Sequence, residues 1–425
     1  MSHDVATNRP IRQARAIPRR RVRWAQHARP RRLTRAPFVA FLLSLLVLLS
    51  PDLTLAPLQA VEPHRAPRPI DEVTLPQVPH FAVAQDIDRR SAGVAAPVPV
   101  AIEIADAPRY RAALEAARSA AGAYGITFAV VRDGELVWAG SSGRDRDGLT
   151  ELTPDSAMVI GSVTKTYVAA TILQLVEEGA VALDESVHAL LPSVKGLNPK
   201  ITIGQLLDHT SGLADVFNET TRKGLEDHPE HAWTSDEVLG TLHAPWYQPG
   251  EGWAYANTNY YLLGLVVERL AGAPLIDELN RRIVGPLGLT GTHMLTADAA
   301  GPLAPAWTTI FWASGAMTSS AADLARWGDA LYGGEILRPE TRQAMLELND
   351  HDYGYGVQKV EVPGATGYGH TGLLNTYTTL LYRHPSEDVT IALLVNRSHV
   401  DLGGMLTVKA ANGGPSLLEL ATDGQ

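Results

Sequence analysis

The sequence of 425 residues contains no cysteine. This absence excludes disulfide bonds, thiolate nucleophiles, cysteine-based metal sites and a lipid anchor on cysteine. It does not argue against export, because a chain of this length can bury a core that needs no disulfides. No internal repeat is evident, and no metal or cofactor is implied by the motifs that follow.

Basic side chains are scarce outside the N-terminus. Residues 1–40 hold eleven Arg, no Lys and one acidic residue, whereas the remaining chain holds 25 basic and 45 acidic side chains. With 45% hydrophobic and 19% charged residues, most of the chain is expected to be globular. Its acidic body argues against nucleic acid as a partner.

The N-terminal segment is typical of an export signal. The arginines precede an apolar run from Phe38 to Leu49, which is short for a membrane-spanning helix and suits a signal peptide. Cleavage after Ala60 and retention as an uncleaved signal anchor both stay open. We expect a signal segment in residues 1–60 and a secreted or cell-envelope location, with membrane contact only through an uncleaved N-terminus.

Residues 61–104 are predicted to be a linker, since seven prolines fall within residues 61–100. A single domain is expected over residues 105–425. It begins with an alanine-rich helix closed by Gly125, and "RDG" at Asp133-Gly134 then indicates a β-hairpin.

The rest of the domain alternates between helical and strand patterns. Residues 180–345 read mostly as helices separated by Pro/Gly loops. Three β-rich runs follow at residues 353–362, 376–384 and 388–396, and the last is apolar on both faces. This order predicts an α+β fold, in which helices flank an antiparallel sheet and an all-helical subdomain is inserted.

The stretch "GSVTKTYVAATILQLVEEG" places Ser162 and Lys165 on one face at the start of an apolar helix that Gly179 ends. Helix capping and a snorkelling lysine explain this pair in isolation. Alternatively, Ser162 is a nucleophile near the positive helix end, and Lys165 is its base if burial keeps the amine neutral.

Two further motifs are ambiguous in the same way. In "WAYANTNYY", Tyr255 and Asn257 are either a packed aromatic and an N-cap or a proton shuttle and an amide that orients lysine and substrate. In "GYGHTGLL", His370-Thr371-Gly372 is expected to open an edge strand along which a substrate pairs, with the Leu373 N–H as an oxyanion donor.

Taken in order, S-x-x-K, Y-x-N and H-T-G resemble the penicillin-recognising serine hydrolases, which include class C β-lactamases, D-alanyl-D-alanine carboxypeptidases and family VIII esterases. Connecting text such as "HTSGL" and "ASGAMTSSAADLARWGDAL" is similar as well, from about Ala105 to Arg397.

The resemblance implies an acyl-enzyme on Ser162, with Lys165 and Tyr255 sharing the proton transfers. Substrate would be bound by Asn257, His370, Thr371, Gly372 and Leu373. The backbone N–H groups of Ser162 and Leu373 would form the oxyanion hole, and His370 would take the place of the lysine common in β-lactamases.

The H-T-G motif and the export signal favour a DD-carboxypeptidase that acts on peptidoglycan stem peptides. One departure weakens this reading, because Gln358 and Lys359 stand where that branch tends to carry a carboxylate-binding arginine. An esterase or β-lactamase-type hydrolase of small substrates, β-lactams included, stays open. A non-catalytic envelope binding protein is disfavoured, since every catalytic position is filled.

Overall fold

The computed structural model describes residues 106–299, 301–384 and 386–422. The signal segment expected in residues 1–60 and the linker expected in residues 61–104 lie outside the described residues. Within the described ranges, no helix combines the length and the apolar character needed to cross a membrane.

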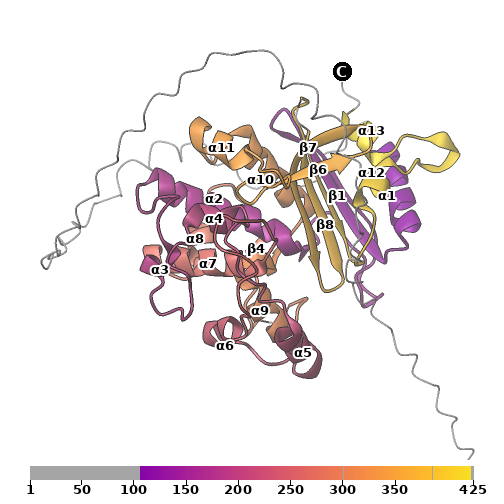
Figure 1. The fold of residues 1–425 in the computed structure, drawn as a ribbon. Helices are drawn as coiled ribbons and strands as arrows, with labels where there is room; N and C mark the ends of the chain where they lie inside the picture. Colours follow the sequence, from indigo (N-terminus) through magenta and orange to yellow (C-terminus); the bar gives the residue numbers. More distant parts are fainter. Residues whose placement is uncertain (1–105, 300, 385, 423–425) are drawn as a thin grey trace, which may run out of the picture. The chain divides into compact units, whose positions relative to one another are not determined.

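A six-stranded antiparallel sheet with the strand order β2-β1-β9-β8-β7-β6 organises the described domain (Figure 1). β1 near the start of the domain pairs with β9 near its end, with Ile126 opposite Val395. The strands are β1 (Gly125–Arg132), β2 (Glu135–Gly143), β6 (Gln358–Val362), β7 (Ala365–Leu374), β8 (Tyr377–Arg383) and β9 (Val389–Val395). The expected antiparallel sheet, in which the two ends of the domain sequence meet, is confirmed.

Local sequence signals account for the strands at the centre of the sheet. Asp133 and Gly134 both have positive φ, as a two-residue hairpin turn requires, and they join β1 to β2. Every residue of β9 is buried, which explains why its sequence is apolar on both faces.

Helices cover both faces of this sheet. α1 (Ala107–Ala121), α12 (Leu402–Thr407) and α13 (Leu417–Thr422) pack on one face around Phe128 and Trp138. α10 (Ala321–Gly333) packs on the opposite face against β1, β8 and β9. The larger hydrophobic core lies on the α10 side and continues into the helical insertion.

The predicted end of the first helix is wrong by one turn. α1 ends at Ala121 because Gly122 adopts a left-handed φ of 59° and its N–H bonds to the carbonyl of Ser119. Gly125 instead begins β1, where an added Cβ would lie 2.3 Å from the Arg144 carbonyl oxygen.

The segment between β2 and β6 is mostly helical, as expected. It also contains a small sheet, β3 (Met158–Val159), β5 (Met317–Ser319) and β4 (His293–Met294), which was not predicted because strands of two or three residues show no alternation. Besides α10, its helices are α2 (Thr164–Glu177), α3 (Val187–Leu190), α4 (Ile203–Leu207), α5 (Glu219–Asp227), α6 (Ser235–Gly240), α7 (Asn257–Ala271), α8 (Leu275–Leu279), α9 (Pro305–Gly315) and α11 (Pro339–Leu346).

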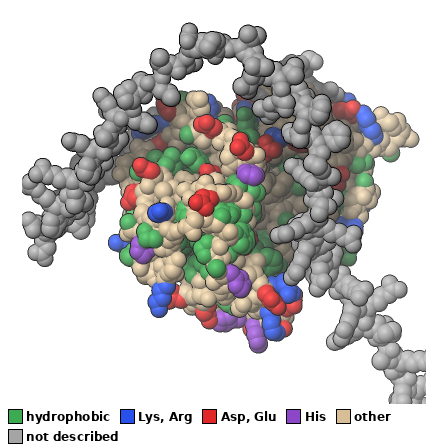
Figure 2. Space-filling view, in the orientation of Figure 1, with side chains coloured by type: hydrophobic (Ala, Val, Ile, Leu, Met, Phe, Trp, Pro, Cys, Tyr) green, Lys and Arg blue, Asp and Glu red, His purple; other side chains and the backbone are tan. Residues whose placement is uncertain are grey.

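Charged side chains are distributed over the surface without a basic field on the face shown in Figure 2. Lys and Arg side chains are scattered there, and α5 pairs its own charges through Arg222–Glu226 and Lys223–Asp227.

Candidate active site

A tight turn places the candidate nucleophile. Gly161 has a φ of 52° and leads into a short 3-10 turn, Gly161–Val163, from which α2 continues. Ser162 is half-buried, and its side chain makes no capping hydrogen bond to either helix. The capping explanation for Ser162 therefore fails.

Lys165 lies in the first turn of α2 and is completely buried, so it does not snorkel. Its Nζ is 3.1 Å from Ser162 Oγ, 2.9 Å from Asn257 Oδ1 and 2.7 Å from the Ser314 carbonyl oxygen. It also lies 4.8 Å from the centre of the Tyr255 ring.

These contacts fix the direction of proton transfer. A neutral amine has two N–H groups and one lone pair, and a carbonyl oxygen can only accept. The N–H groups of Lys165 therefore point to Asn257 Oδ1 and the Ser314 carbonyl. The lone pair remains for the Ser162 hydroxyl, which is the geometry of a general base.

Burial supplies the neutral amine that this geometry requires. Removal from water lowers the pKa of Lys165 to about 7, and the negative charge of Asp215 opposes that fall. The uncharged form of Lys165 is therefore accessible near neutral pH.

Ser314 owes its position to a break in α9. Trp312, inside this helix, has a φ of 24° and a ψ of −112°, a strained conformation for a residue with a side chain. Gly264 of α7 leaves room for the indole, since an added Cβ there would lie 2.9 Å from a Trp312 ring atom. Sequence reasoning missed Ser314, because a backbone carbonyl leaves no signal in the side-chain pattern.

Asn257 is the first residue of α7, yet its side chain does not cap that helix. Its Nδ2 donates to Asp215 Oδ2 at 3.2 Å, and its backbone N–H donates to Asp215 Oδ1 at 3.1 Å. The amide is thereby oriented with Oδ1 toward Lys165. Asp215 was not predicted from the sequence, where its signal is an isolated acid directly after "HTSGLA".

Tyr255 approaches the same point from the loop before α7. Its hydroxyl is buried and makes no hydrogen bond of regular geometry among the described residues, although it lies close enough to Ser162 for that hydroxyl to act on its pKa. Burial raises the pKa of Tyr255 well above its ordinary value, so the phenol is protonated. A protonated hydroxyl with no fixed partner beside Ser162 and Lys165 is suited to pass a proton to a departing group.

The segment "HTSGL" supports the site structurally. His209 packs against Tyr255 in a tilted arrangement, with ring centroids 4.3 Å apart. His209 Nδ1 accepts from the Ala256 N–H at 3.2 Å and lies 2.8 Å from Asn259 Nδ2. These contacts hold the loop that carries Tyr255.

The turn of Ser162 lies against β7. A Cβ on Gly372 would meet the Ile160 carbonyl oxygen at 1.9 Å, and one on Gly161 would meet Leu373 N at 2.8 Å. The two glycines thus permit a close approach between the turn that carries Ser162 and the backbone of β7 at Leu373. The oxyanion hole expected from the N–H groups of Ser162 and Leu373 stays a prediction.

The placement of residues 370–372 differs from the expectation. They lie in the second half of β7 instead of opening it, and β8 pairs with them on one side. On the other side β6 ends its pairing at Gln358–Gly369, and no strand among the described residues pairs with β7 there from His370 onward; we call this side the free edge of β7. Thr371 and Leu373 are exposed along this edge.

His370 is buried beside the site and does not present a charge to it. Its Nδ1 lies 2.6 Å from the Thr371 carbonyl, which can only accept, so Nδ1 carries the proton. Its Nε2 then accepts from the Tyr353 hydroxyl at 3.0 Å. Burial, reinforced by the charge of Lys165, lowers the pKa of His370 to about 3. In this structure His370 is a neutral group and is no electrostatic substitute for a lysine.

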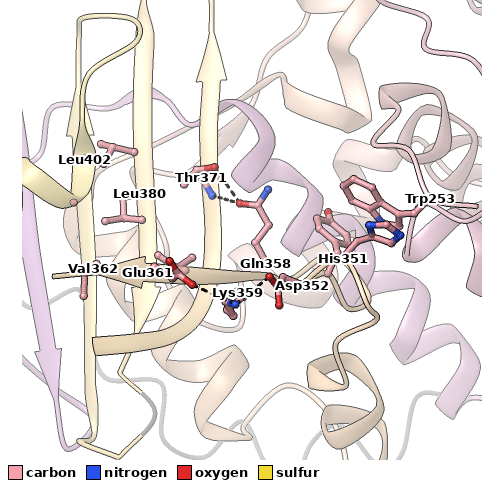
Figure 3. Close-up of a pocket in the computed structure, with 13 residues that line it drawn as sticks. Trp253, His351, Asp352, Gln358, Lys359, Glu361, Val362, Thr371, Leu380 and Leu402 are labelled. Carbon is pink, nitrogen blue, oxygen red and sulfur yellow. Dashed lines mark hydrogen bonds and ion pairs between the residues drawn. The ribbon is translucent and has the colours of Figure 1, made fainter. Parts of the chain in front are cut away.

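Gln358 and Lys359 face different partners (Figure 3). Gln358 Oε1 accepts from both the backbone N–H and the hydroxyl of Thr371, each at 3.0 Å. Lys359 Nζ lies 3.0 Å from Asp352 and 3.2 Å from Glu361, so its charge is already paired. Both residues line a pocket of about 380 Å³ that adjoins the site through Thr371.

The pH dependence of activity tests the role of Lys165. Because the free amine is the base, kcat/KM for p-nitrophenyl butyrate should rise as pH passes through about 7 and level off above it. Asp215 stabilises the ammonium form, so Asp215→Asn should move this rise to lower pH by roughly one unit. Asp208→Asn, which changes another buried acid, is the control and should leave the midpoint in place. A midpoint that moves upward in Asp215→Asn would contradict the assignment.

Comparison with known proteins agrees with this geometry. The family model described as Beta-lactamase matches residues 111–411. Penicillin-binding protein 4 of Amycolatopsis lactamdurans is 29% identical over 317 residues, covering 64% of this chain and 80% of that protein. Esterase EstB of Burkholderia gladioli is 34% identical over 188 residues, covering 41% of this chain and about half (48%) of the esterase.

Among solved structures, a D-stereospecific amidohydrolase from Streptomyces sp. superposes with a TM-score of 0.62 and 28% identity, covering 75% of this chain and 99% of that one. The family model spans well over half of the chain. The chain therefore belongs to the beta-lactamase family of serine hydrolases.

Proposed function

We propose that the protein hydrolyses amide bonds of short substrates built on D-amino acids, through an acyl-enzyme on Ser162. The observation that carries the reaction type is the buried Lys165 amine, whose two N–H groups are held by obligatory acceptors while its lone pair meets the Ser162 hydroxyl. The substrate class is supported by the likeness to the D-stereospecific amidohydrolase over nearly all of that chain.

The reaction would proceed in two acyl transfers. Ser162 Oγ attacks the carbonyl carbon while its proton passes to Lys165, and the oxygen anion is held by the N–H groups of Ser162 and Leu373. Tyr255 gives its proton to the leaving nitrogen and regains one from Lys165, so that an amine departs. Water then attacks the acyl-Ser162 ester by the reverse proton path. Each oxyanion donor contributes about 3 kcal/mol to lowering the barrier.

A DD-carboxypeptidase acting on cell-wall stem peptides is the second candidate. It is supported by the likeness to penicillin-binding protein 4 over 80% of that protein. Such a substrate ends in a carboxylate, which is bound best by an unpaired cation. At the β7 edge the described residues offer the neutral amide of Gln358 and the neutral ring of His370, while Lys359 is paired with two acids. The amidase reading therefore ranks first.

A substrate panel separates the candidates. We expect N-acetyl-D-alaninamide to be hydrolysed with a kcat/KM at least about tenfold above those of its L isomer and of an acyl-D-Ala-D-Ala peptide. Preference for the acyl-D-Ala-D-Ala peptide would establish the carboxypeptidase instead. Turnover of p-nitrophenyl butyrate or nitrocefin alone would establish an esterase or a β-lactamase-type enzyme. Ser162→Ala is the control and should lose both turnover and labelling by a fluorophosphonate.

We also propose that the protein is exported, on the strength of the arginine-rich start and the apolar run from Phe38 to Leu49. Expression of the full chain followed by cell fractionation and sequencing of the mature N-terminus tests this. A product found outside the cytoplasm is expected, whether the segment is cleaved near Ala60 or kept as an anchor.

A further inference from the structure

The free edge of β7 is partly occupied by a side chain from the neighbouring strand. Beyond the Gln358–Gly369 pair, β6 no longer accompanies β7, and backbone donors on that side have no partner strand. In a strand, residues two apart direct their N–H groups to the same side. The N–H groups of Thr371 and Leu373 therefore both face the open edge.

Gln358 satisfies the first of these donors. Its Oε1 accepts the Thr371 N–H and the Thr371 hydroxyl, each at 3.0 Å, as the dashed lines in Figure 3 show. The side-chain carbonyl thus occupies the position that the backbone carbonyl of an added strand would take. The next outward donor, Leu373 N, is the one that lies beside Ser162.

The geometry also indicates which part of a substrate meets Gln358. Tyr255, the proposed proton donor for the leaving group, lies near His370, with ring centroids 6.4 Å apart. A leaving group that takes its proton from Tyr255 would therefore lie near His370 and its neighbour Thr371. A leaving group of more than one residue would next seek to pair with the Thr371 N–H, which is already engaged.

We propose that Gln358 is a specificity-determining residue that caps the β7 edge and restricts the enzyme to short leaving groups. This inference deepens the proposed function and rests on acyl transfer at Ser162. A longer leaving group must displace two hydrogen bonds before it pairs along β7. Loss of interactions of this size corresponds to roughly tenfold in kcat/KM.

A series of uncharged esters tests the cap without relying on amide cleavage. The three substrates are N-acetyl-D-alanine esters of glycolamide, glycolyl-glycinamide and glycolyl-diglycinamide, which share one acyl group. For the wild-type protein, kcat/KM should fall about tenfold from the shortest to the longest leaving group. In Gln358→Ala the fall should shrink to less than about twofold, because the Thr371 N–H is free to pair.

Two variants separate hydrogen bonding from side-chain volume. Gln358→Glu still accepts hydrogen bonds from Thr371, so its kcat/KM should decrease with leaving-group length as in the wild type. Gln358→Met fills a similar volume but accepts no hydrogen bond, so it should behave as Gln358→Ala does. The Met variant also serves if the alanine variant does not fold. Lys359→Ala, whose side chain pairs with Asp352 and Glu361, is the matched neighbour and should keep the wild-type profile.

The outcomes are distinct from those of the function test. Two results would overturn the proposed role of Gln358. One is equal kcat/KM for all three esters in the wild type, and the other is a wild-type decrease of kcat/KM with leaving-group length in both Gln358→Ala and Gln358→Met. Hydrolysis of these esters without hydrolysis of N-acetyl-D-alaninamide would reject the amidase proposal. The dependence of kcat/KM on the length of the ester leaving group would still test the role of Gln358. Ester turnover that persists in Ser162→Ala would overturn both.

Discussion

Lys165→Met is expected to lower kcat/KM by about 10³-fold while the chain stays folded. Methionine has a similar volume and fits a fully buried position, but it cannot take the Ser162 proton. The residual activity should also lose the rise near pH 7, because the titrating amine is gone. Steady-state kinetics on p-nitrophenyl butyrate across pH, together with circular dichroism, measures both effects.

The control for this variant is Lys200→Met, which makes the same change at an exposed lysine. It should retain wild-type kinetics. A second comparison is Ser162→Ala, which removes the acceptor of the acyl group itself and should show no acyl-enzyme by mass spectrometry. If Lys165→Met acylates at the wild-type rate, the amine is not the base and the proton path described above is wrong.

Gly372→Ala is expected to reduce kcat by about 10² to 10³-fold with little change in KM. The added Cβ would lie 1.9 Å from the Ile160 carbonyl oxygen, a backbone atom that cannot swing aside. The turn carrying Ser162 must then move away from β7, which separates Ser162 N from Leu373 N. Because both donors act on charge that develops in the transition state, the loss should fall on kcat.

A matched glycine on the same strand distinguishes lost chemistry from lost stability. At Gly369 an added Cβ would also meet a carbonyl oxygen at 1.9 Å, that of Leu381 on β8, away from the nucleophile. Gly369→Ala should therefore lower the melting temperature as much as Gly372→Ala does, but with a much smaller loss of kcat at a temperature where both are folded. Equal kcat losses in the two variants would show that the Gly372 contact serves stability alone.

The fold was largely predictable because its signals are local. Asp133-Gly134 indicates a hairpin whatever lies around it, and a largely apolar run such as the seven residues of β9 indicates a covered strand. The predicted end of the first helix lies too late in the sequence because both Gly122 and Gly125 could end a helix. Only the backbone conformation of Gly122 distinguishes them.

The site was predictable only in part. Helical spacing placed Ser162 beside Lys165, and resemblance to a family added Tyr255, Asn257 and His370. Asp215 acts through the amide of Asn257, and such a contact between distant segments leaves no periodic signal. The contacts of His370 could not be predicted, since they depend on the Tyr353 hydroxyl and the Thr371 carbonyl at hydrogen-bond distance. The bond from Thr371 to Gln358 depends on where β6 stops, which sequence does not indicate.

The pairing of β1 with β9 has a consequence for how the molecule is made. One of the interior hydrogen-bonded ladders of the sheet joins two segments that are synthesised at opposite ends of the domain, with Ile126 opposite Val395. Closure of so long a loop is slow, and it cannot begin until the last strand has left the ribosome. A nascent chain therefore lacks its central sheet throughout synthesis, which keeps it available to any machinery that handles unfolded polypeptides.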